Sequence, residues 1–468
     1  MHRERTSRVW NWGIAALMMV ALISDMRAQQ APPSGITIQQ AVENAVRNYP
    51  AITVSQEQID AASAGIQLAR TAYLPRVGSL AQFNRATRNN VFGLLLPQSV
   101  IPSISGPVLG SNNSASVWGS AVGATVTWEP FDFGLRRANV SAATAAKART
   151  EATLKRTQFD VAVAAADAFL TLVAAQETVR AAQAGVDRAQ SLAQVVRAQA
   201  DAQLRPGADV ARTEAELAAA RTQLVQAQQA RDIARTVLSQ FIAVQPAQIA
   251  VSDTRLLQLP PEQTLEPFDV VRNPIAVEQT ALIDQKKAEL KILEKSYVPR
   301  VFAQGSAFAR GTGAETDGTR LGGANGLAPD TPNYALGFSV TFPFLDRASI
   351  RAREAGQSAA IRAETARYQQ ITTELTARRN AAVAALEGSR KVAANTPVAA
   401  SAAMTASQQA NARYQAGLGT IVEVADAQRL LTQAEIDDAL ARLGVWRALL
   451  SVAATAGDIQ PFLTDAAP

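Results

Sequence analysis

Two halves of the chain carry the same short sequences in the same order, and this duplication constrains the fold more than any other feature. The pentapeptide YLPRV at 73–77 recurs 224 residues later as YVPRV at 297–301. Further along each half, residues 209–214 align with 423–428 at an offset of 214. Because the offset changes only between the paired strands expected in each half, the halves differ mainly in one loop. A repeat that keeps its register in this way indicates a duplicated structural unit.

The repeat predicts a leader followed by two structural units. Residues 1–28 show a secretory signal pattern, in which arginines precede an apolar run and small residues follow it. A short membrane anchor is the alternative for this segment. The first unit then spans 29–268 and ends in a proline-rich connector, and the second unit spans 269–468. In each unit we expect a helix, a pair of strands, and a long helical hairpin with a tip.

Residues 116–128 alternate between apolar and small or polar side chains, which is typical of a strand with two different faces. Trp118 and Trp128 stand ten residues apart on the apolar face. A tilted strand rises about 25 Å over that length, which matches the apolar band of an outer-membrane β-barrel between two aromatic girdles. Tyr334 and Phe342 end a similar face in the second unit. A strand of a soluble β-sandwich would show the same alternation, and that alternative stays open.

The two strand pairs, at 76–130 and 300–343, give four strands per chain. Four strands cannot enclose a pore, and an open sheet edge would leave backbone hydrogen-bonding groups unsatisfied in lipid. We therefore expect a small ring of identical chains to close one barrel.

Most of the remaining sequence predicts long helices. From 134 to 202 almost every residue favours a helix, and a helix of that length reaches about 100 Å. Pro50 should break the earlier helical run at 36–72. The hairpin tips are expected near 203–209 and 414–423, because glycines in these segments accept the left-handed backbone conformation that reverses the chain.

Composition excludes most catalytic chemistry. The chain contains no cysteine, and its only histidine, His2, lies in the expected signal peptide. Metal sites and acid–base catalysis built on thiolates or histidines therefore have no residues to use. Acidic and basic residues are interspersed and the net charge is only +5, which argues against nucleic acid as a partner. We expect no enzyme activity, no cofactor and no bound metal.

With the YLP motif before the first strand pair and the sequence YQAGLGTIVEVADA at 414–427, the chain resembles the TolC family of outer-membrane efflux proteins. The resemblance covers essentially the whole mature chain. It implies an α+β fold in which a homotrimer forms a 12-stranded outer-membrane β-barrel, continued by a long α-helical coiled-coil tunnel in the periplasm. It also implies a passive exit channel for small molecules, with outer-membrane lipid, a periplasmic adaptor (membrane fusion) protein and an inner-membrane transporter as partners.

The resemblance assigns roles to residues at both tips. By position, Tyr414 matches the family's gate tyrosine, and Asp209 matches the acid that this tyrosine bonds in the closed state. Glu423 and Asp426 match the acids that ring the constriction, where copies from three chains would concentrate negative charge and favour cations. The residues expected to contact the adaptor are Arg205, Pro206, Gly207, Gly417, Leu418 and Gly419.

Two positions depart from the family pattern. Gly419 stands where the family often has a basic residue, although Arg205 occupies the equivalent place in the first tip. Gln203 stands where the first tip would have its glycine, which leaves open how that tip turns.

Simpler interpretations exist for the tip residues. Asp209, Glu423 and Asp426 could be ordinary helix starters, because acids are favoured in the first turn of a helix. Tyr414 could be a packing residue, and the glycines could be helix caps without an adaptor role. Two other functions also stay open: the channel of a type I protein secretion system, and a periplasmic coiled-coil adaptor without a pore.

Overall fold

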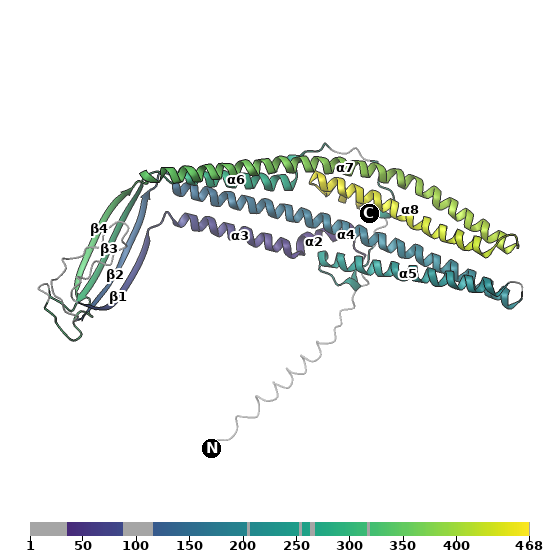
Figure 1. The fold of residues 1–468 in the computed structure, drawn as a ribbon, viewed down its shortest axis with the longest axis horizontal. Coiled ribbons are helices and arrows are strands. Elements are labelled where there is room, and N and C mark those ends of the chain that lie inside the picture. Colours follow the sequence, from purple (N-terminus) through teal and green to yellow (C-terminus); the bar gives the residue numbers. More distant parts are fainter. Residues whose placement is uncertain are drawn as a thin grey trace, which may run out of the picture.

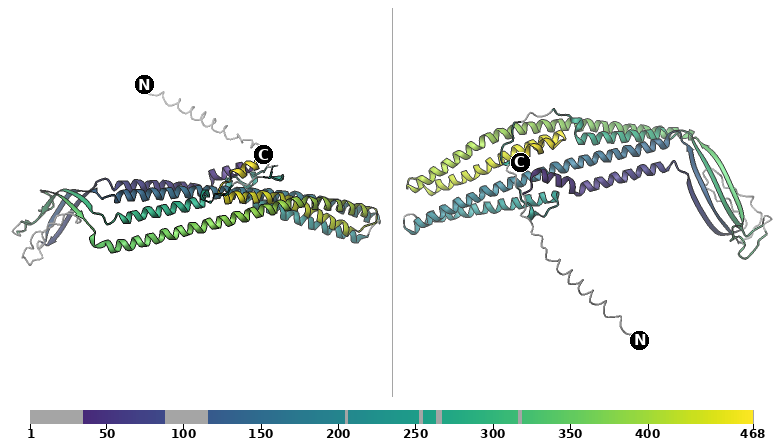
Figure 2. Two further views of the ribbon diagram at one scale, coloured as in Figure 1. Left: turned by 90° about the horizontal axis from the view of Figure 1, so that it is seen from above. Right: turned by 180° about the vertical axis from the view of Figure 1, so that it is seen from behind.

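The computed structural model describes residues 35–87, 116–203, 206–251, 255–262, 267–315 and 319–467. The expected signal peptide and Arg205 lie outside these described residues. Within them the molecule is elongated, with a four-stranded sheet at one end and the tips of two helical hairpins at the other (Figure 1). Figure 2 shows the same arrangement from above and from behind.

The predicted helices form with nearly the expected boundaries. Pro50 breaks the first helical run as expected, and it begins the next helix, where its missing N–H has no intrahelical partner to lose. The prediction of one helix over 134–202 is confirmed, because α4 has 67 residues. The helices are α2 (Ile38–Asn48), α3 (Pro50–Thr71), α4 (Leu135–Asp201), α5 (Gly207–Ile242), α6 (Pro274–Glu294), α7 (Arg347–Gln415), α8 (Ile421–Ala456) and α9 (Gln460–Ala466).

The two hairpins turn at equivalent positions. α4 ends at Asp201 and α7 at Gln415, and these two positions are 214 apart in the sequence. α5 begins at Gly207 and α8 at Ile421, which keeps the same offset. Each unit therefore has a helix, two strands, a long helix, a tip and a returning helix, as the internal repeat predicts.

The four strands form one antiparallel sheet in the order β1-β2-β3-β4. Pairing of β2 with β3 joins the two units. In this pair Gly123 makes room for Phe308, because a Cβ at the glycine would lie 2.3 Å from the Cβ of Phe308. β1 and β4 each have one partner in the described sheet, so each leaves an edge unpaired. The strands are β1 (Arg76–Thr87), β2 (Ser116–Phe131), β3 (Arg300–Thr312) and β4 (Thr331–Thr341).

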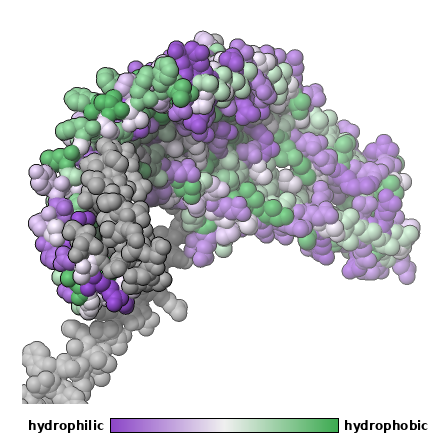
Figure 3. All heavy atoms as spheres, turned by 60° about the vertical axis from the view of Figure 1, so that its left-hand side comes forward, coloured by the Kyte–Doolittle hydropathy of each residue, from purple (hydrophilic) through white to green (hydrophobic). Residues whose placement is uncertain are grey.

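One face of the sheet is apolar and exposed, and the other is mostly small or polar, with Leu80, Phe302 and Phe308 as its large apolar side chains. The strand registers bring every second residue to the same face, as the alternating sequence predicts. Figure 3 turns the sheet end toward the viewer, with hydrophobic surface in green along its upper left edge. The large side chains exposed on the apolar face are Val77, Phe83, Val122, Val126, Trp128, Tyr334, Leu336, Phe338 and Val340. The opposite face carries Gln82, Asn84, Thr125, Thr127, Gln304 and Ser306.

A buried ion pair ties the sheet to the helices. Arg136, in the first turn of α4, contacts Asp132 just after β2, and both residues are 7% exposed. The Arg136 guanidinium also donates hydrogen bonds to the carbonyl oxygens of Ala72 and Pro130, each at 3.2 Å. Its carbon lies 4.6 Å from the ring centre of Tyr73. One side chain thus joins the end of α3, the end of β2 and the start of α4.

The main hydrophobic core lies midway along the helices, near the C-terminus (Figure 1). Trp446 of α8 is fully buried there, and its indole N–H donates to the Gln258 carbonyl oxygen at 2.9 Å. The indole also meets the Phe462 ring edge to face, with centres 6.1 Å apart. The proline-rich connector between the units therefore packs over this core through short 3₁₀ turns.

Two described helices, α4 and α8, contain an 18-residue window long and apolar enough to cross a membrane. Half of the α4 window (50%) and 44% of the α8 window are buried inside the protein. Phe169 and Trp446, both 0% exposed, belong to the core at these places. Burial of this extent is the property of core helices, so these windows are weak evidence for spanning helices.

Candidate gate at the helical tips

The second tip is a helix end with a defined hydrogen-bond pattern. Gly417 follows α7 in the left-handed conformation, with φ of +75°. The Leu418 N–H donates to the Arg413 carbonyl oxygen at 2.8 Å, and the Gly417 N–H donates to that of Tyr414 at 3.1 Å. This pair of bonds is a Schellman motif, which satisfies the last carbonyl groups of a helix. The interpretation of Gly417 as a helix cap is therefore correct, and it leaves an adaptor role untested.

The first tip turns with a glutamine at the equivalent position. Gln203 adopts a φ of +62° after α4, although it has a side chain that disfavours this conformation. α5 then begins at Gly207, with Pro206 preceding it as the N-cap residue. Asp209 lies in the first turn of α5 and is half-buried.

Tyr414 lies in a small apolar cluster that joins both hairpins. Its side chain is 1% exposed and packs with residues of α4 and α8 and against Val210 of α5. Asp209 immediately precedes Val210, so the structure brings the two predicted gate residues to the same region. The pairing of Tyr414 with Asp209 in a closed state stays a prediction. The buried members of the cluster are Leu192, Val196, Tyr414, Ile421 and Val424.

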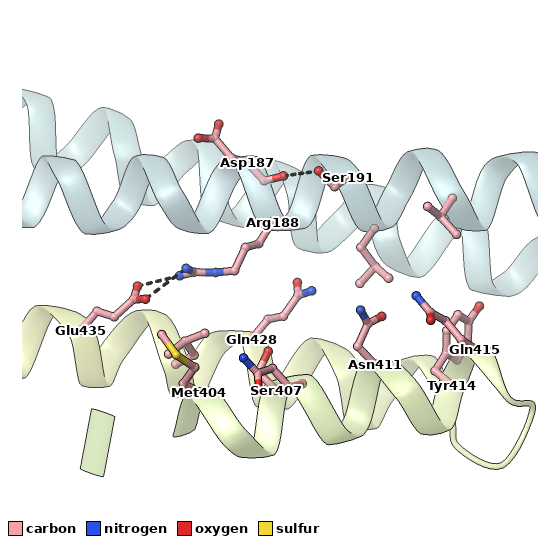
Figure 4. Close-up of a pocket in the computed structure, with 14 residues that line it drawn as sticks. Asp187, Arg188, Ser191, Met404, Ser407, Asn411, Tyr414, Gln415, Gln428 and Glu435 are labelled. Carbon is pink, nitrogen blue, oxygen red and sulfur yellow. Dashed lines mark hydrogen bonds and ion pairs between the residues drawn. The ribbon is translucent and has the colours of Figure 1, made fainter. Parts of the chain in front are cut away.

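A hollow of about 550 Å³ opens beside this cluster, between α4 and the α7–α8 hairpin (Figure 4). At its far end, Arg188 of α4 contacts both carboxylate oxygens of Glu435 on α8, at 2.8 and 3.2 Å. Arg188 also donates a hydrogen bond to the Thr432 hydroxyl at 2.8 Å. These contacts connect the two hairpins about three turns from the tip, counted along α8. Tyr414 lines the near end of the hollow.

The two predicted constriction acids have different surroundings. Glu423 is exposed in the first turn of α8, where its backbone N–H and its carboxylate both bond the Thr420 hydroxyl at 3.3 Å. It therefore takes part in capping α8, as the simpler interpretation predicts. Asp426 forms an ion pair with Arg429 on the same helix. Their position at the mouth of a pore stays a prediction.

The predicted girdle residues border the apolar face of the sheet. Tyr334 is 82% exposed, and Trp128 and Phe342 are 44% and 54% exposed. The Trp128 indole donates to the Tyr73 carbonyl oxygen at 3.2 Å, which places it at the helical end of the sheet. Trp118 lies near the other end, and the guanidinium carbon of Arg85 is 5.2 Å from its ring centre. An apolar ring with one polar tip suits the boundary between lipid and water.

The residues that sequence reasoning missed are the arginines that connect elements. The ion pairs of Arg188 and Arg136 hold separate segments together. The ion pair of Arg429 neutralises Asp426. For Arg136 and Arg429 a signal was present, because each lies three or four residues after its acid. Arg188 and Glu435 are 247 residues apart, so no local pattern could reveal them.

Comparison with known proteins agrees with the overall fold and with the internal repeat. The profile described as outer membrane efflux protein matches residues 41–244 and 271–458, one segment in each unit. The Campylobacter jejuni CmeC outer membrane channel is similar in structure, with a TM-score of 0.69 and 14% identity over 90% of this chain and 85% of that chain. CusC, described in terms of transmembrane channel formation, has a TM-score of 0.73 and 12% identity over 92% and 94%.

The open state of the Neisseria gonorrhoeae MtrE outer membrane channel is also similar, with a TM-score of 0.66 and 17% identity over 90% of this chain and 89% of that chain. Among curated protein sequences, none matches this chain. At such low identities the similar structures establish a shared fold. The profile match covers most of both repeats, so it establishes membership of a sequence family as well as the fold.

Proposed function

Because the chain belongs to the outer membrane efflux protein family, we propose that it is the passive exit channel of a tripartite efflux system. It is a protein of the outer membrane, with its helices in the periplasm. In this role it receives small molecules from an inner-membrane transporter, through a periplasmic adaptor, and releases them outside the cell. The channel itself supplies a route and a gate, and the transporter supplies the energy.

The observation that carries the proposal is the sheet. Its apolar face is exposed in the single chain, with Leu336 and Phe338 at 78% and 81%, and its opposite face is mostly small or polar. The free edges of β1 and β4 would be satisfied by pairing with neighbouring copies. Three copies would give a closed 12-stranded barrel with lipid outside and water inside. A periplasmic adaptor without a pore would have no use for such a face.

Ring closure is tested with engineered disulfides, since the chain has no cysteine of its own. Gln82→Cys on β1 is combined in turn with Ala335→Cys, Gly337→Cys or Ser339→Cys on β4, all on the polar face. If β1 of one chain pairs with β4 of the next, one combination yields covalent trimers on a non-reducing gel. Gln304→Cys on the inner strand β3 is the matched control and should give none. Monomers from every combination, together with a monomeric mass in detergent, would contradict the ring.

Transport is tested in cells that lack the gene. Loss of the channel should raise the accumulation of a fluorescent efflux dye, and re-expression should restore its expulsion. A secretion channel has the same passive architecture, so the two functions differ only in cargo. Unchanged dye accumulation, together with loss of a secreted protein from the medium, would favour the type I secretion alternative.

The proposed gate consists of Tyr414, Asp209, Glu423 and Asp426, and the tips around Gly207 and Gly417–Gly419 would contact the adaptor. The placement of Tyr414 and Val210 in one buried cluster supports this proposal, because moving one hairpin away from the other must disrupt that cluster. A cluster that joins two hairpins at their tips is a suitable place to control an opening.

A further inference from the structure

A line of alternating charges crosses from α5 to α8 just behind the second tip. Arg429 of α8 pairs with Asp426 on its own helix, and its Nε lies 3.8 Å from the Glu216 carboxylate of α5. Glu216 is also 3.6 Å from Arg212. Two cations and two anions therefore alternate in one connected group, whose net charge is zero.

Small residues on α4 allow these long side chains to meet. α4 lies between α5 and α8 (Figure 1). Along this contact Ala182, Gly185 and Ala189 lie low on the α4 surface, and the alanines are 2% and 8% exposed. They form the floor of a hollow of about 500 Å³ whose rim includes Glu216 and Arg429. Larger side chains on the floor would fill the space that the arginine crosses.

The charged groups in this hollow stay in contact with water. The side chains of Arg429 and Asp426 are 63% and 57% exposed, and that of Glu216 is 21% exposed. Because these charged groups are neighbours, an ion in the hollow would meet the sum of their fields rather than the field of Asp426 alone. Glu423, one turn nearer the tip, has no ion pair with a basic side chain of the described residues.

We propose that Arg429 determines the ion preference of the channel by cancelling the charge of Asp426. Of the two acids predicted at the constriction, Glu423 then remains as the one without an ion-pair partner among the described residues. This inference rests on the proposed function, in which the tips surround the pore mouth. It revises the expectation that both acids attract cations, because the second acid is neutralised within its own chain.

The test is the reversal potential of single channels in planar bilayers under a KCl gradient. Arg429→Gln leaves the group with a net negative charge and should raise the K⁺ over Cl⁻ permeability ratio about twofold or more. Asp426→Asn leaves a net positive charge and should lower the ratio. The double variant is neutral again, so its ratio should return to that of the wild-type channel. Arg429→Lys keeps the charge and should resemble the wild-type channel.

Arg447→Gln is the matched control. Arg447 also lies on α8 and also pairs with an acid, Asp167 at 2.9 Å, but far from the tip. The K⁺ over Cl⁻ permeability ratio of the Arg447→Gln channel should equal that of the wild-type channel. If the wild-type protein conducts and all variants share one ratio, the role of Arg429 is wrong while the channel stands. If the wild-type protein forms no conducting pore, the proposed function fails and this inference fails with it.

Discussion

Arg136 and Asp132 form an ion pair that is buried where the sheet meets the helices, with Nε and Oδ2 3.1 Å apart. Asp132 also accepts hydrogen bonds from the backbone N–H groups of Gly134 and Arg136. Gly134 has a φ of +101° and directly precedes α4. The pair therefore holds the sharp turn between a strand in the membrane and a helix outside it.

Removing the arginine should destabilise this junction strongly. Arg136→Met leaves the Asp132 charge buried without its partner, which costs about 3–5 kcal/mol. Thermal unfolding of the purified protein in detergent measures the loss. Arg347→Met, at the exposed start of α7 in the second unit, should change stability by no more than about 0.5 kcal/mol. Equal losses in the two variants would contradict a special role for the buried pair.

The same site predicts a dependence on acid. Burial raises the pKa of Asp132, but the N–H groups of Arg136 and Gly134 and the Arg136 guanidinium lower it by more, so the pKa lies below its ordinary value. A lowered folded-state pKa contributes stability above the unfolded pKa of about 3.9, and this contribution is lost as the pH falls through the folded pKa. The difference in melting temperature between wild-type protein and Asp132→Asn should therefore stay constant down to about pH 4 and shrink as the pH falls further. A difference that stays constant well below pH 4 would show that the carboxylate has no such role.

Close packing of α4 against α8 should make Gly185 intolerant of a methyl group. A Cβ there would lie 3.0 Å from Oγ1 and 3.1 Å from Cγ2 of Thr432, whose hydroxyl is already held by Arg188. Gly185→Ala should cost about 1–3 kcal/mol of packing, against a gain of about 1 kcal/mol in helix propensity. Gly444→Ala, where a Cβ meets nothing within 4 Å, should show the gain alone.

Relief of the contact provides the second arm of this experiment. In a Thr432→Ala background, Gly185→Ala should become stabilising, because the two nearest atoms are gone. Melting temperatures of the wild-type protein, Gly185→Ala, Thr432→Ala and the double variant form a double-mutant cycle. If Gly185→Ala and Gly444→Ala were equally stabilising in the wild-type background, the hairpins would not pack as closely as described.

The two tips should respond oppositely to exchange of their left-handed residues. Gly417→Ala should weaken the second tip by about 1 kcal/mol, and Gln203→Gly should strengthen the first by a similar amount. Amide hydrogen exchange of tip peptides, followed by mass spectrometry, measures local opening. Faster exchange in Gln203→Gly would mean that the glutamine side chain contributes more than its backbone strain costs.

Truncation of Tyr414 should open the proposed gate. Its side chain is 1% exposed, and Tyr414→Ala would remove about 3–5 kcal/mol of local packing from the cluster between the hairpins. Single-channel conductance should increase, because the hairpins are held together less firmly at the tips. Tyr368→Ala, on the same helix but far from the tip, should keep the wild-type conductance. Unchanged conductance in Tyr414→Ala would assign Tyr414 to packing alone.

The fold could be predicted from the sequence because its signals are periodic and repeated. Alternation at 116–128 gave the strand and its two faces, and unbroken helix-forming sequence gave α4. Each boundary was supported twice, since the second unit repeats the first. Even the first tip follows the second in its helix limits, although Gln203 carries no glycine signal there. The turn is set by the packing of both hairpins, which overrides the local preference of one residue.

The contacts between hairpins could not be predicted in the same way. Whether Arg188 meets Glu435 depends on how far each helix is rotated about its axis. The pairing of Arg429 with Glu216 depends in addition on small residues of a third helix, α4. Local sequence patterns specify which face of a helix is buried, but they do not specify which residue of a distant helix lies opposite.

α4 runs without interruption from the sheet to the tip, and this continuity restricts how proteins of this shape can change in length. One inserted residue would turn everything beyond it by about 100° and move its apolar side away from α5 and α8. An insertion of about seven residues, close to two turns, restores the orientation and lengthens the rod by about 10 Å. All helices of the wall must gain such a segment together. The distance that the protein can bridge across the periplasm is therefore adjustable only in discrete increments.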